Sequence, residues 1–238
     1  MKRAPAFWRP LGKGCARHLL VPVFAIAAAT VAQPQAKLES VLAKMDQTSS
    51  TFRTAQADFT WMTFNDVIND FDDKQNGTIY FERDRNETRM AADISTPQKK
   101  EVLFSDGKIQ IYQPSLRTVD IYDVGTHREE FESFLVLGFG SSGTELRKAF
   151  DVSYGADEKI DNIETARLDL TPKSDAVKKQ FSQIVLWIDL QNGISVQQKL
   201  VKGDGYRIAK YSNIKLGEKI PGKVFKLNVP AKTTKTNH

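Results

Sequence analysis

The spacing of apolar residues changes once along the chain, near residue 55. Upstream of that point, apolar side chains recur every three or four residues, which predicts an amphipathic helix over residues 37–53. The apolar stripe of this helix consists of Leu38, Val41, Leu42, Met45 and Phe52. Downstream, apolar and polar residues alternate, as they do in β-strands that bury one face and expose the other.

Alternating segments separated by turn signals predict about nine to eleven strands. They are centred on residues 57–63, 79–82, 88–92, 102–104, 109–111, 119–121, 168–170, 184–190, 196–200 and 206–214. The pairs Asp106-Gly107, Asn192-Gly193 and Asp204-Gly205 are hairpin signals, so most neighbouring strands are expected to be antiparallel. Two short helices are expected to interrupt the strands, at residues 128–137 and 144–150. The pattern therefore predicts an α+β fold, as a single domain over residues 37–238.

A sheet of this size must curl or close. We expect an unclosed antiparallel β-barrel, a half-barrel with a lid or plug of a few α-helices, which leaves part of its apolar face as a cavity. The expected lining residues are Phe59, Trp61, Ile79, Phe81, Met90, Phe104 and Ile111, and the expected lid residues are Phe131, Phe134 and Leu135. Ordinary core packing is the alternative for each of them.

Arg83 is the most informative single residue of this pattern. It continues Ile79 and Phe81 at a period of two, so it is expected on the same face, at the edge of the cavity. There its guanidinium would donate hydrogen bonds to ligand carbonyls or to the lid, because burial without partners is costly. Alternatively, the strand ends at Glu82 and Arg83 is a solvated loop residue.

A basic segment and a short apolar run precede the predicted helix. Five lysines and arginines lie in the first seventeen residues, and the run Leu19–Ala29 ends in small residues. A membrane span needs roughly 20 apolar residues, so the run is too short for one. The layout predicts a secretory signal peptide over residues 1–32, cleaved between residues 29 and 36, in preference to a retained anchor or a buried helix.

Removal of that segment changes the composition of the protein. The chain has 34 Lys+Arg and 29 Asp+Glu, and loss of the five leader bases leaves 29 of each. The basic pI thus belongs to the leader and gives no argument for nucleic-acid binding. The only cysteine, Cys15, also lies in the leader, so the mature chain is expected to have no disulfide and no cysteine metal site.

The sequence contains no convincing catalytic or metal-binding constellation, so we expect neither an enzyme nor a cofactor. His127 is the only histidine between the leader and the C-terminal residue, and it lacks a second metal ligand at a usable spacing. No G-x-S-x-G motif supplies a nucleophilic serine. The acidic residues from Asp66 to Asn76 do not have the EF-hand spacing, and we interpret them as a solvated hairpin loop.

One glycine motif remains. Residues Gly138–Gly143 match G-x-G-x-x-G, but no βαβ unit surrounds them, as a dinucleotide site requires. We therefore interpret this segment as a flexible connection between the two short predicted helices.

The chain resembles outer-membrane lipoprotein carriers, the LolA-like proteins, over nearly all of its predicted mature length. The resemblance rests on an N-terminal amphipathic helix and five motifs in order. These are Phe52-x5-Asp58-Phe59, Gly77-Thr-Ile-Tyr-Phe-Glu-Arg83, Leu103-Phe-Ser-Asp-Gly-Lys-Ile-Gln-Ile-Tyr-Gln-Pro114, Leu170-Thr-Pro-Lys173 and Phe225-x-Leu-x-Val-Pro230. Two features depart from the family pattern: Asp84 follows the arginine where proline is frequent, and the segment 65–76 is long and acidic.

The resemblance implies a monomeric periplasmic carrier whose cavity takes the acyl chains of lipoproteins and ferries them from the inner to the outer membrane. Its implied partners are acylated lipoproteins, an inner-membrane lipoprotein-releasing transporter and an outer-membrane acceptor, with only transient membrane contact and no nucleic acid. By motif position, Arg83 would latch the lid in the empty state. The alternative is a periplasmic lipid-binding sensor or interaction module on the same fold, which acts on another lipid or on a protein partner.

Overall fold

The computed structural model describes residues 29–84, 87–125, 137–203 and 205–238. Residues 1–28 of the predicted signal peptide lie outside the described residues. So do His127 and the predicted lid residues Phe131, Phe134 and Leu135. No helix within the described ranges is long and apolar enough to cross a membrane.

Helix α1 (Ala29–Thr51) contains the predicted amphipathic segment and extends it toward the N-terminus. All five residues of the predicted stripe are buried. Four of them, Leu38, Val41, Leu42 and Met45, pack with Leu168, Leu186 and other residues toward one edge of the sheet. Burial of each such side chain stabilises the fold by about 1.5–3 kcal/mol, so this face fixes α1 on one half of the sheet.

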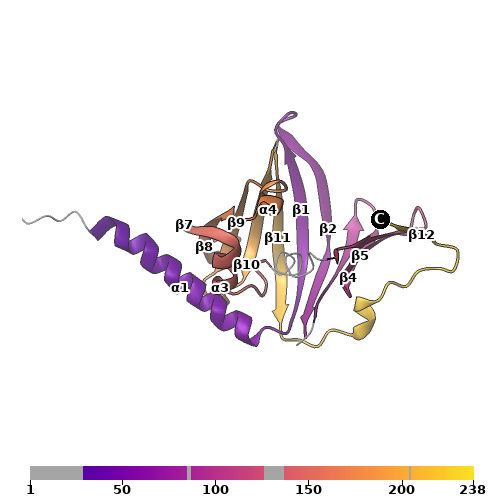
Figure 1. Cartoon of the computed structure of the whole chain (residues 1–238), viewed down its shortest axis with the longest axis horizontal. Helices are drawn as coiled ribbons and strands as arrows, with labels where there is room; N and C mark the ends of the chain where they lie inside the picture. The colour runs from indigo at the N-terminus through magenta and orange to yellow at the C-terminus, as the bar shows by residue number, and fades with distance from the viewer. Residues whose placement is uncertain (1–28, 85–86, 126–136, 204) are drawn as a thin grey trace, which may run out of the picture.

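Within the described ranges, twelve strands form one unclosed sheet in the order β12-β6-β5-β4-β3-β2-β1-β11-β10-β9-β8-β7 (Figure 1). In the first half these are β1 (Thr54–Asn65), β2 (Asp70–Arg83), β3 (Thr88–Thr96), β4 (Lys100–Ser105), β5 (Lys108–Gln113) and β6 (Thr118–Asp123). In the second half they are β7 (Phe150–Ile160), β8 (Ile163–Pro172), β9 (Gln183–Asp189), β10 (Ser195–Lys202), β11 (Gly205–Leu216) and β12 (Thr234–Asn237). The short helices are α3 (Gly143–Ala149), α4 (Asp175–Lys178) and the 3-10 turn η2 (Gly222–Phe225).

Two antiparallel meanders join through the pairing of β1 with β11, and only β12 is parallel to its neighbour β6. The outer strands β12 and β7 do not pair with each other, so the barrel stays open. The predicted fold class, an unclosed antiparallel half-barrel with helices, is therefore confirmed.

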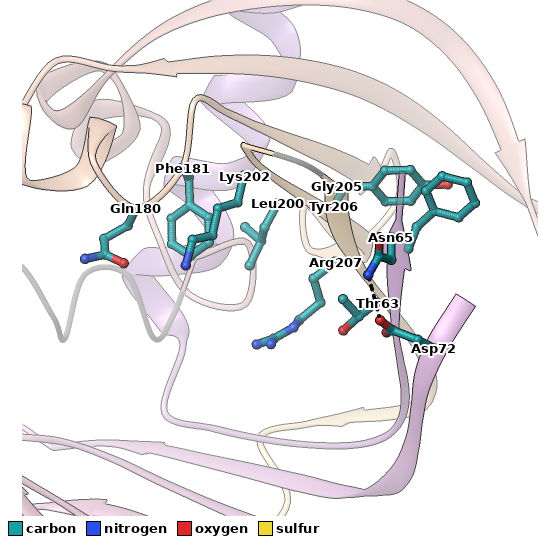
Figure 2. Close-up of a pocket in the computed structure, with 11 residues that line it drawn as sticks. Thr63, Asn65, Asp72, Gln180, Phe181, Leu200, Lys202, Gly205, Tyr206 and Arg207 are labelled. Atoms are coloured by element: carbon teal, nitrogen blue, oxygen red, sulfur yellow. Dashed lines mark hydrogen bonds between the residues drawn. The ribbon is translucent and has the colours of Figure 1, made fainter. Parts of the chain in front are cut away.

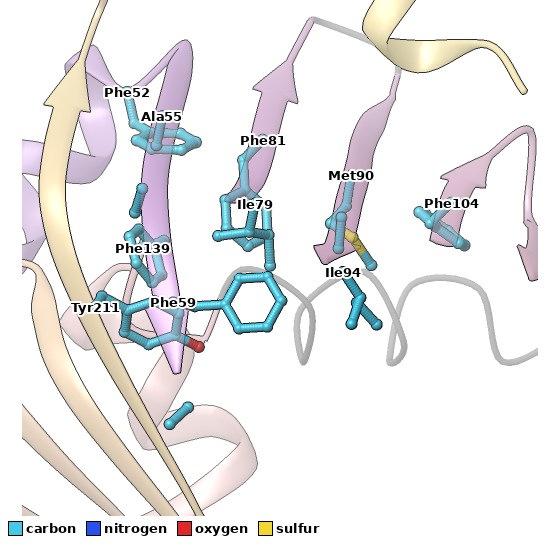
Figure 3. Packing of buried hydrophobic residues seen from close by; sticks show 13 residues of the cluster. Phe52, Ala55, Phe59, Ile79, Phe81, Met90, Ile94, Phe104, Phe139 and Tyr211 are labelled. Carbon is cyan, nitrogen blue, oxygen red and sulfur yellow. The ribbon is translucent and has the colours of Figure 1, made fainter. Parts of the chain in front are cut away.

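The two faces of the sheet have different apolar partners. The inner face carries Phe59, Ile79, Phe81, Met90 and Phe104, which form one cluster with Phe139 and Tyr211 (Figure 3). On the outer face, Ala91 and Leu103 pack against Ile220 and Phe225 of the C-terminal segment. Side chains alternate between the faces at a period of two, which is why neighbours such as Met90 and Ala91 belong to different clusters.

The sequence pattern missed two strands. β7 was missed because it is an edge strand whose alternation includes Gly155 and several charged residues in place of large apolar side chains. β12, with the sequence Thr-Lys-Thr-Asn, is exposed at all four positions. Its conformation comes from main-chain pairing with the edge of β6, a long-range interaction that leaves no apolar pattern.

The prediction of a long solvated loop over residues 65–76 is wrong. β1 continues to Asn65 and β2 begins at Asp70, so only residues 66–69 form the turn. Asp70, Asp72 and Asp73 belong to β2, in the β1–β2 ribbon whose turn forms the tip of the sheet in Figure 1, and β1 also pairs with β11 as far as Asn65. Paired main-chain hydrogen bonds with β1 stabilise extended structure that these residues do not favour by themselves.

Candidate functional site

The strand register arranges the inner face of β1 and β11 in layers. Phe59 lies opposite Tyr211, Trp61 lies opposite Ala209, and Thr63 lies opposite Arg207. Directly opposed residues of antiparallel strands project to the same face, so these pairs follow one another along the inside of the sheet. The layers become more polar toward the end of the sheet where β1 turns into β2.

An apolar cavity of about 170 Å³ lies against these layers. Four predicted ligand-binding residues line it: Trp61, Ile79, Phe81 and Met90. The remaining wall comes from Leu137, Phe181, Gln198, Leu200, Arg207, Ala209 and Tyr211. Burial raises the pKa of the Tyr211 hydroxyl above its ordinary value, because a phenolate would be poorly solvated there.

The other predicted lining residues lie on the same face, outside this cavity. Phe59 and Phe104 are buried core residues, with 3% and 0% of their surface exposed. Ile111 is half-buried on β5, opposite Val102, which packs at the margin of the core cluster. The structure therefore brings together four of the seven predicted lining residues around a cavity and places the other three beside it.

Besides the seven unpredicted residues of the cavity wall, the sequence interpretation missed Phe139. Its ring stacks on Phe81 with centroids 5.2 Å apart and meets Tyr211 edge-on at 4.5 Å. It is buried on the inner face and reaches the sheet from the segment that follows residue 136 (Figure 3). The only sequence signal for its burial was an apolar residue between two glycines. A single side chain inserted from a loop leaves no periodic pattern.

The glycines of the G-x-G-x-x-G segment allow close packing. A Cβ atom on Gly140 would lie 2.8 Å from the ring of Phe52, and one on Gly143 would lie 2.6 Å from Leu42. Gly138 has a φ of 82°, in the left-handed region that favours glycine. All three glycines are buried, so this segment is a packed plug. In the following text, residues 137–142 are called the plug segment.

Arg83 connects the sheet to the plug segment. It is the last residue of β2 and is half-buried, so the alternative in which the strand ends at Glu82 is wrong. Its Nη1 donates a hydrogen bond to the Gly140 carbonyl at 3.0 Å and lies 3.4 Å from Ser49 Oγ. The guanidinium carbon lies 5.4 Å from the centre of the Phe52 ring. The predicted position at the edge of the apolar interior is thus the position that the structure gives.

The site offers binding chemistry. Within the described ranges, no group of three or more histidine, cysteine or carboxylate side chains could hold a metal ion. The cavity wall is aromatic and aliphatic except for Gln198, Arg207 and the polar atoms of Trp61 and Tyr211. Such a wall suits an apolar chain, but about 170 Å³ is below the roughly 300–1,000 Å³ of small-molecule pockets. A long acyl chain would therefore have to displace part of the plug segment or extend into adjoining space.

Comparison with solved structures gives fold relatives of low sequence identity. An uncharacterized conserved protein from Thermus thermophilus matches 85% of this chain and 99% of its own, with 8% identity and a TM-score of 0.53. MucB matches over 84% of this chain with 13% identity and a TM-score of 0.52, and 65% of MucB is covered. A LolA superfamily protein from Nitrosomonas europaea matches 80% of this chain and 97% of its own, with 14% identity and a TM-score of 0.41.

No protein-family model matches this chain, and no curated protein matches its sequence. At such identities the structural likeness concerns the fold alone. The fold predicted from the sequence, an unclosed antiparallel sheet with a few helices, is confirmed at that level.

Proposed function

We propose that this chain is a periplasmic carrier that binds the acyl chains of lipoproteins in its apolar cavity and ferries them from the inner to the outer membrane. The observation that carries this proposal is the cavity of Trp61, Ile79, Phe81 and Met90 inside a LolA-like half-barrel. Its partners would be acylated lipoproteins, an inner-membrane lipoprotein-releasing transporter and an outer-membrane acceptor. The carrier would act as a monomer without a cofactor, as one domain over residues 37–238.

The plug segment explains how such a carrier releases its ligand. Each CH₂ group moved from water to an apolar site gains about 0.8 kcal/mol, so a whole acyl chain gains on the order of 10 kcal/mol. Entry of the chain would displace Phe139, whose own burial is worth about 1.5–3 kcal/mol. Because the protein's own aromatic side chain competes for the same space, the net affinity is lowered and transfer to an acceptor becomes feasible.

Tryptophan fluorescence gives a site-specific test. Without the predicted leader, the chain retains Trp61 in the cavity and Trp187 on the outer face, where its Nε1 donates to Glu158 at 2.7 Å. A brominated acyl chain should quench Trp61 in the Trp187→Phe variant and leave Trp187 unquenched in the Trp61→Phe variant. Equal quenching of both tryptophans, or of neither, would contradict binding in the cavity.

The cargo itself is tested by mass spectrometry of the purified chain. We expect acylated peptides or intact lipoproteins to co-purify and to be lost when Trp61 and Phe81 are both replaced by polar residues. A Val119→Ala variant is a suitable control for general destabilisation, because Val119 is buried and does not line the cavity. Purified protein that neither contains nor binds an acylated peptide would exclude the carrier function.

A second candidate is a lipid-binding sensor or interaction module that binds a protein partner. One observation favours it: the turn of the β1–β2 ribbon presents Val67 and Ile68 with 80% and 58% of their surfaces exposed. Apolar side chains at a projecting tip suit contact with a partner. If this candidate is right, replacing both residues by serine should abolish partner binding without changing the affinity for an acyl chain. If the chain is a carrier, variants of the cavity residues should abolish lipoprotein transfer.

A further inference from the structure

The apolar cavity adjoins a second hollow of about 230 Å³, whose mixed wall includes the two cationic side chains of Lys202 and Arg207 (Figure 2). Three side chains, Phe181, Leu200 and Arg207, line both spaces. Together the two hollows fall within the roughly 300–1,000 Å³ of small-molecule pockets. One ligand could therefore occupy both hollows, with an apolar part in the first and a polar part in the second.

The strand register places Arg207 at the boundary between these two spaces. It lies opposite Thr63 on β1 and opposite Leu200 on β10, two residues from Ala209 on the inner face. Its guanidinium carbon lies 6.0 Å from the centre of the ring of Trp61, which is part of the apolar cavity wall. An extended apolar chain that contacts Trp61 would thus bring its polar end to Arg207.

The second hollow carries an excess of positive charge. Lys202 and Arg207 both line it, and their side chains extend into the same region (Figure 2). Neither forms a salt bridge with any carboxylate within the described ranges. Among the described residues of the wall, the one carboxylate is that of Asp72, which accepts a hydrogen bond from Asn65 at 3.3 Å. Arg83 differs, since it already donates to Gly140 near the other end of the sheet.

We propose that this hollow binds the anionic head group, a carboxylate or a phosphate, of an amphiphile whose acyl chain fills the cavity. This inference rests on the proposed acyl-chain binding and adds anionic lipids as a second class of ligand for the same cavity. The planar guanidinium of Arg207 matches both oxygens of a carboxylate or phosphate, and Lys202 adds a second charge. Both cations are exposed, and their combined attraction is expected to favour the anionic lipid by about tenfold over a neutral one.

The preference for an anionic head group is measured with three ligands that have acyl or alkyl chains of the same length. Hexadecanoate, hexadecyl phosphate and hexadecanol, each below its micelle concentration, would displace a fluorescent acyl probe from the full-length mature protein. Both anions should bind about tenfold more tightly than the alcohol, and Arg207→Gln should remove that difference, so that all three ligands bind this variant with similar affinity. Lys202→Gln should reduce the difference in part, and it provides an independent variant if Arg207→Gln does not fold.

Lys199 provides a matched control on the neighbouring strand. Its Nζ lies 3.9 Å from the centre of the Tyr206 ring and its side chain lines neither hollow. Lys199→Gln removes the same charge, so a general effect of net charge would appear equally in this variant. The anion preference should persist in Lys199→Gln.

The outcomes separate this inference from the proposed function. If hexadecanol binds as tightly as the anions, or if Arg207→Gln and Lys202→Gln both retain the preference, the head-group site is wrong and acyl-chain binding stands. If inorganic phosphate displaces hexadecyl phosphate at a similar concentration, the hollow is a site for free anions and the amphiphile assignment is wrong. If none of the three lipids displaces the probe, acyl-chain binding itself fails.

Discussion

Replacement of Arg83 by leucine is expected to strengthen acyl-chain binding. In the structure, Arg83 Nη1 donates to the Gly140 carbonyl at 3.0 Å and so holds the plug segment against the end of β2. The plug segment in turn places Phe139 on Phe81 in the space that a ligand would take. Loss of the hydrogen bond should favour an open state, in which Phe139 has left its place against the wall residues Phe81 and Tyr211.

The magnitude follows from the contacts that the substitution removes. A hydrogen bond with one charged partner contributes about 1.5–3 kcal/mol, and the half-exposed position of Arg83 favours the lower end. The contact with the Phe52 ring adds about 0.5 kcal/mol. Ser49 Oγ also donates to the Gly140 carbonyl, at 2.7 Å, so that carbonyl keeps one partner in the variant. A net change of about 1.5 kcal/mol shifts the closed-to-open equilibrium by roughly tenfold.

A ligand that binds only the open state gains affinity by the same factor while the closed state dominates. The dissociation constant of a brominated acyl chain, measured by quenching of Trp61, should therefore fall about tenfold in Arg83→Leu. Arg89→Leu is the matched control, because Arg89 pairs with Glu82 and lies over Phe225, away from the plug segment. Unchanged or weaker binding by Arg83→Leu, relative to this control, would refute the latch.

Three further substitutions test the plug, the packing of α1 and the pH dependence of its attachment. Phe139→Ala should lower the free energy of unfolding by about 3–5 kcal/mol in urea titrations, since a fully buried ring is lost; a change below about 1 kcal/mol would contradict its role in the core. Gly143→Ala places a Cβ atom 2.6 Å from Leu42 and should lower Tm, whereas Gly222→Ala meets nothing within 4 Å and should not. Hydrogen bonds from Lys37 and Tyr154 lower the pKa of the Asp157 carboxyl below its ordinary value of 3.8. The stabilisation from these bonds is therefore present above pH 3.8 and disappears as the pH falls through the lowered pKa. The difference in Tm between the wild type and Asp157→Asn should vanish in acid, and a difference that persists there would exclude this linkage.

The sequence alone determined which residues face the interior in the N-terminal helix and in strands where only one face is apolar. The stripe from Leu38 to Met45 repeats with the helical period, and Ile79, Phe81 and Arg83 repeat with the strand period. These periods follow from local backbone geometry, so they can be read from neighbouring residues without knowledge of the fold. The same reasoning placed Trp61 and Met90 in the cavity wall, where the structure has them.

Local patterns were insufficient where both faces of a strand carry apolar residues. In β11, Tyr206 and Ile208 alternate with Ala209 and Tyr211, so the sequence does not decide which face Arg207 takes. Pairing with β1, about 140 residues earlier in the chain, puts Arg207 opposite Thr63 on the inner face. Long-range pairing also extended the acidic β1–β2 ribbon and formed β12 on the edge of β6.

Tertiary structure alone decided how the interior is divided between plug and cavity. Phe139 enters the sheet because Gly140 and Gly143 let the chain approach Phe52 and Leu42 more closely than any residue with a Cβ atom could. Such close approach depends on three segments distant in sequence meeting at one place, and no single segment encodes it. Periodicity thus determined the apolar lining of this half-barrel, whereas the packing of side chains from distant segments determined what space remains within it.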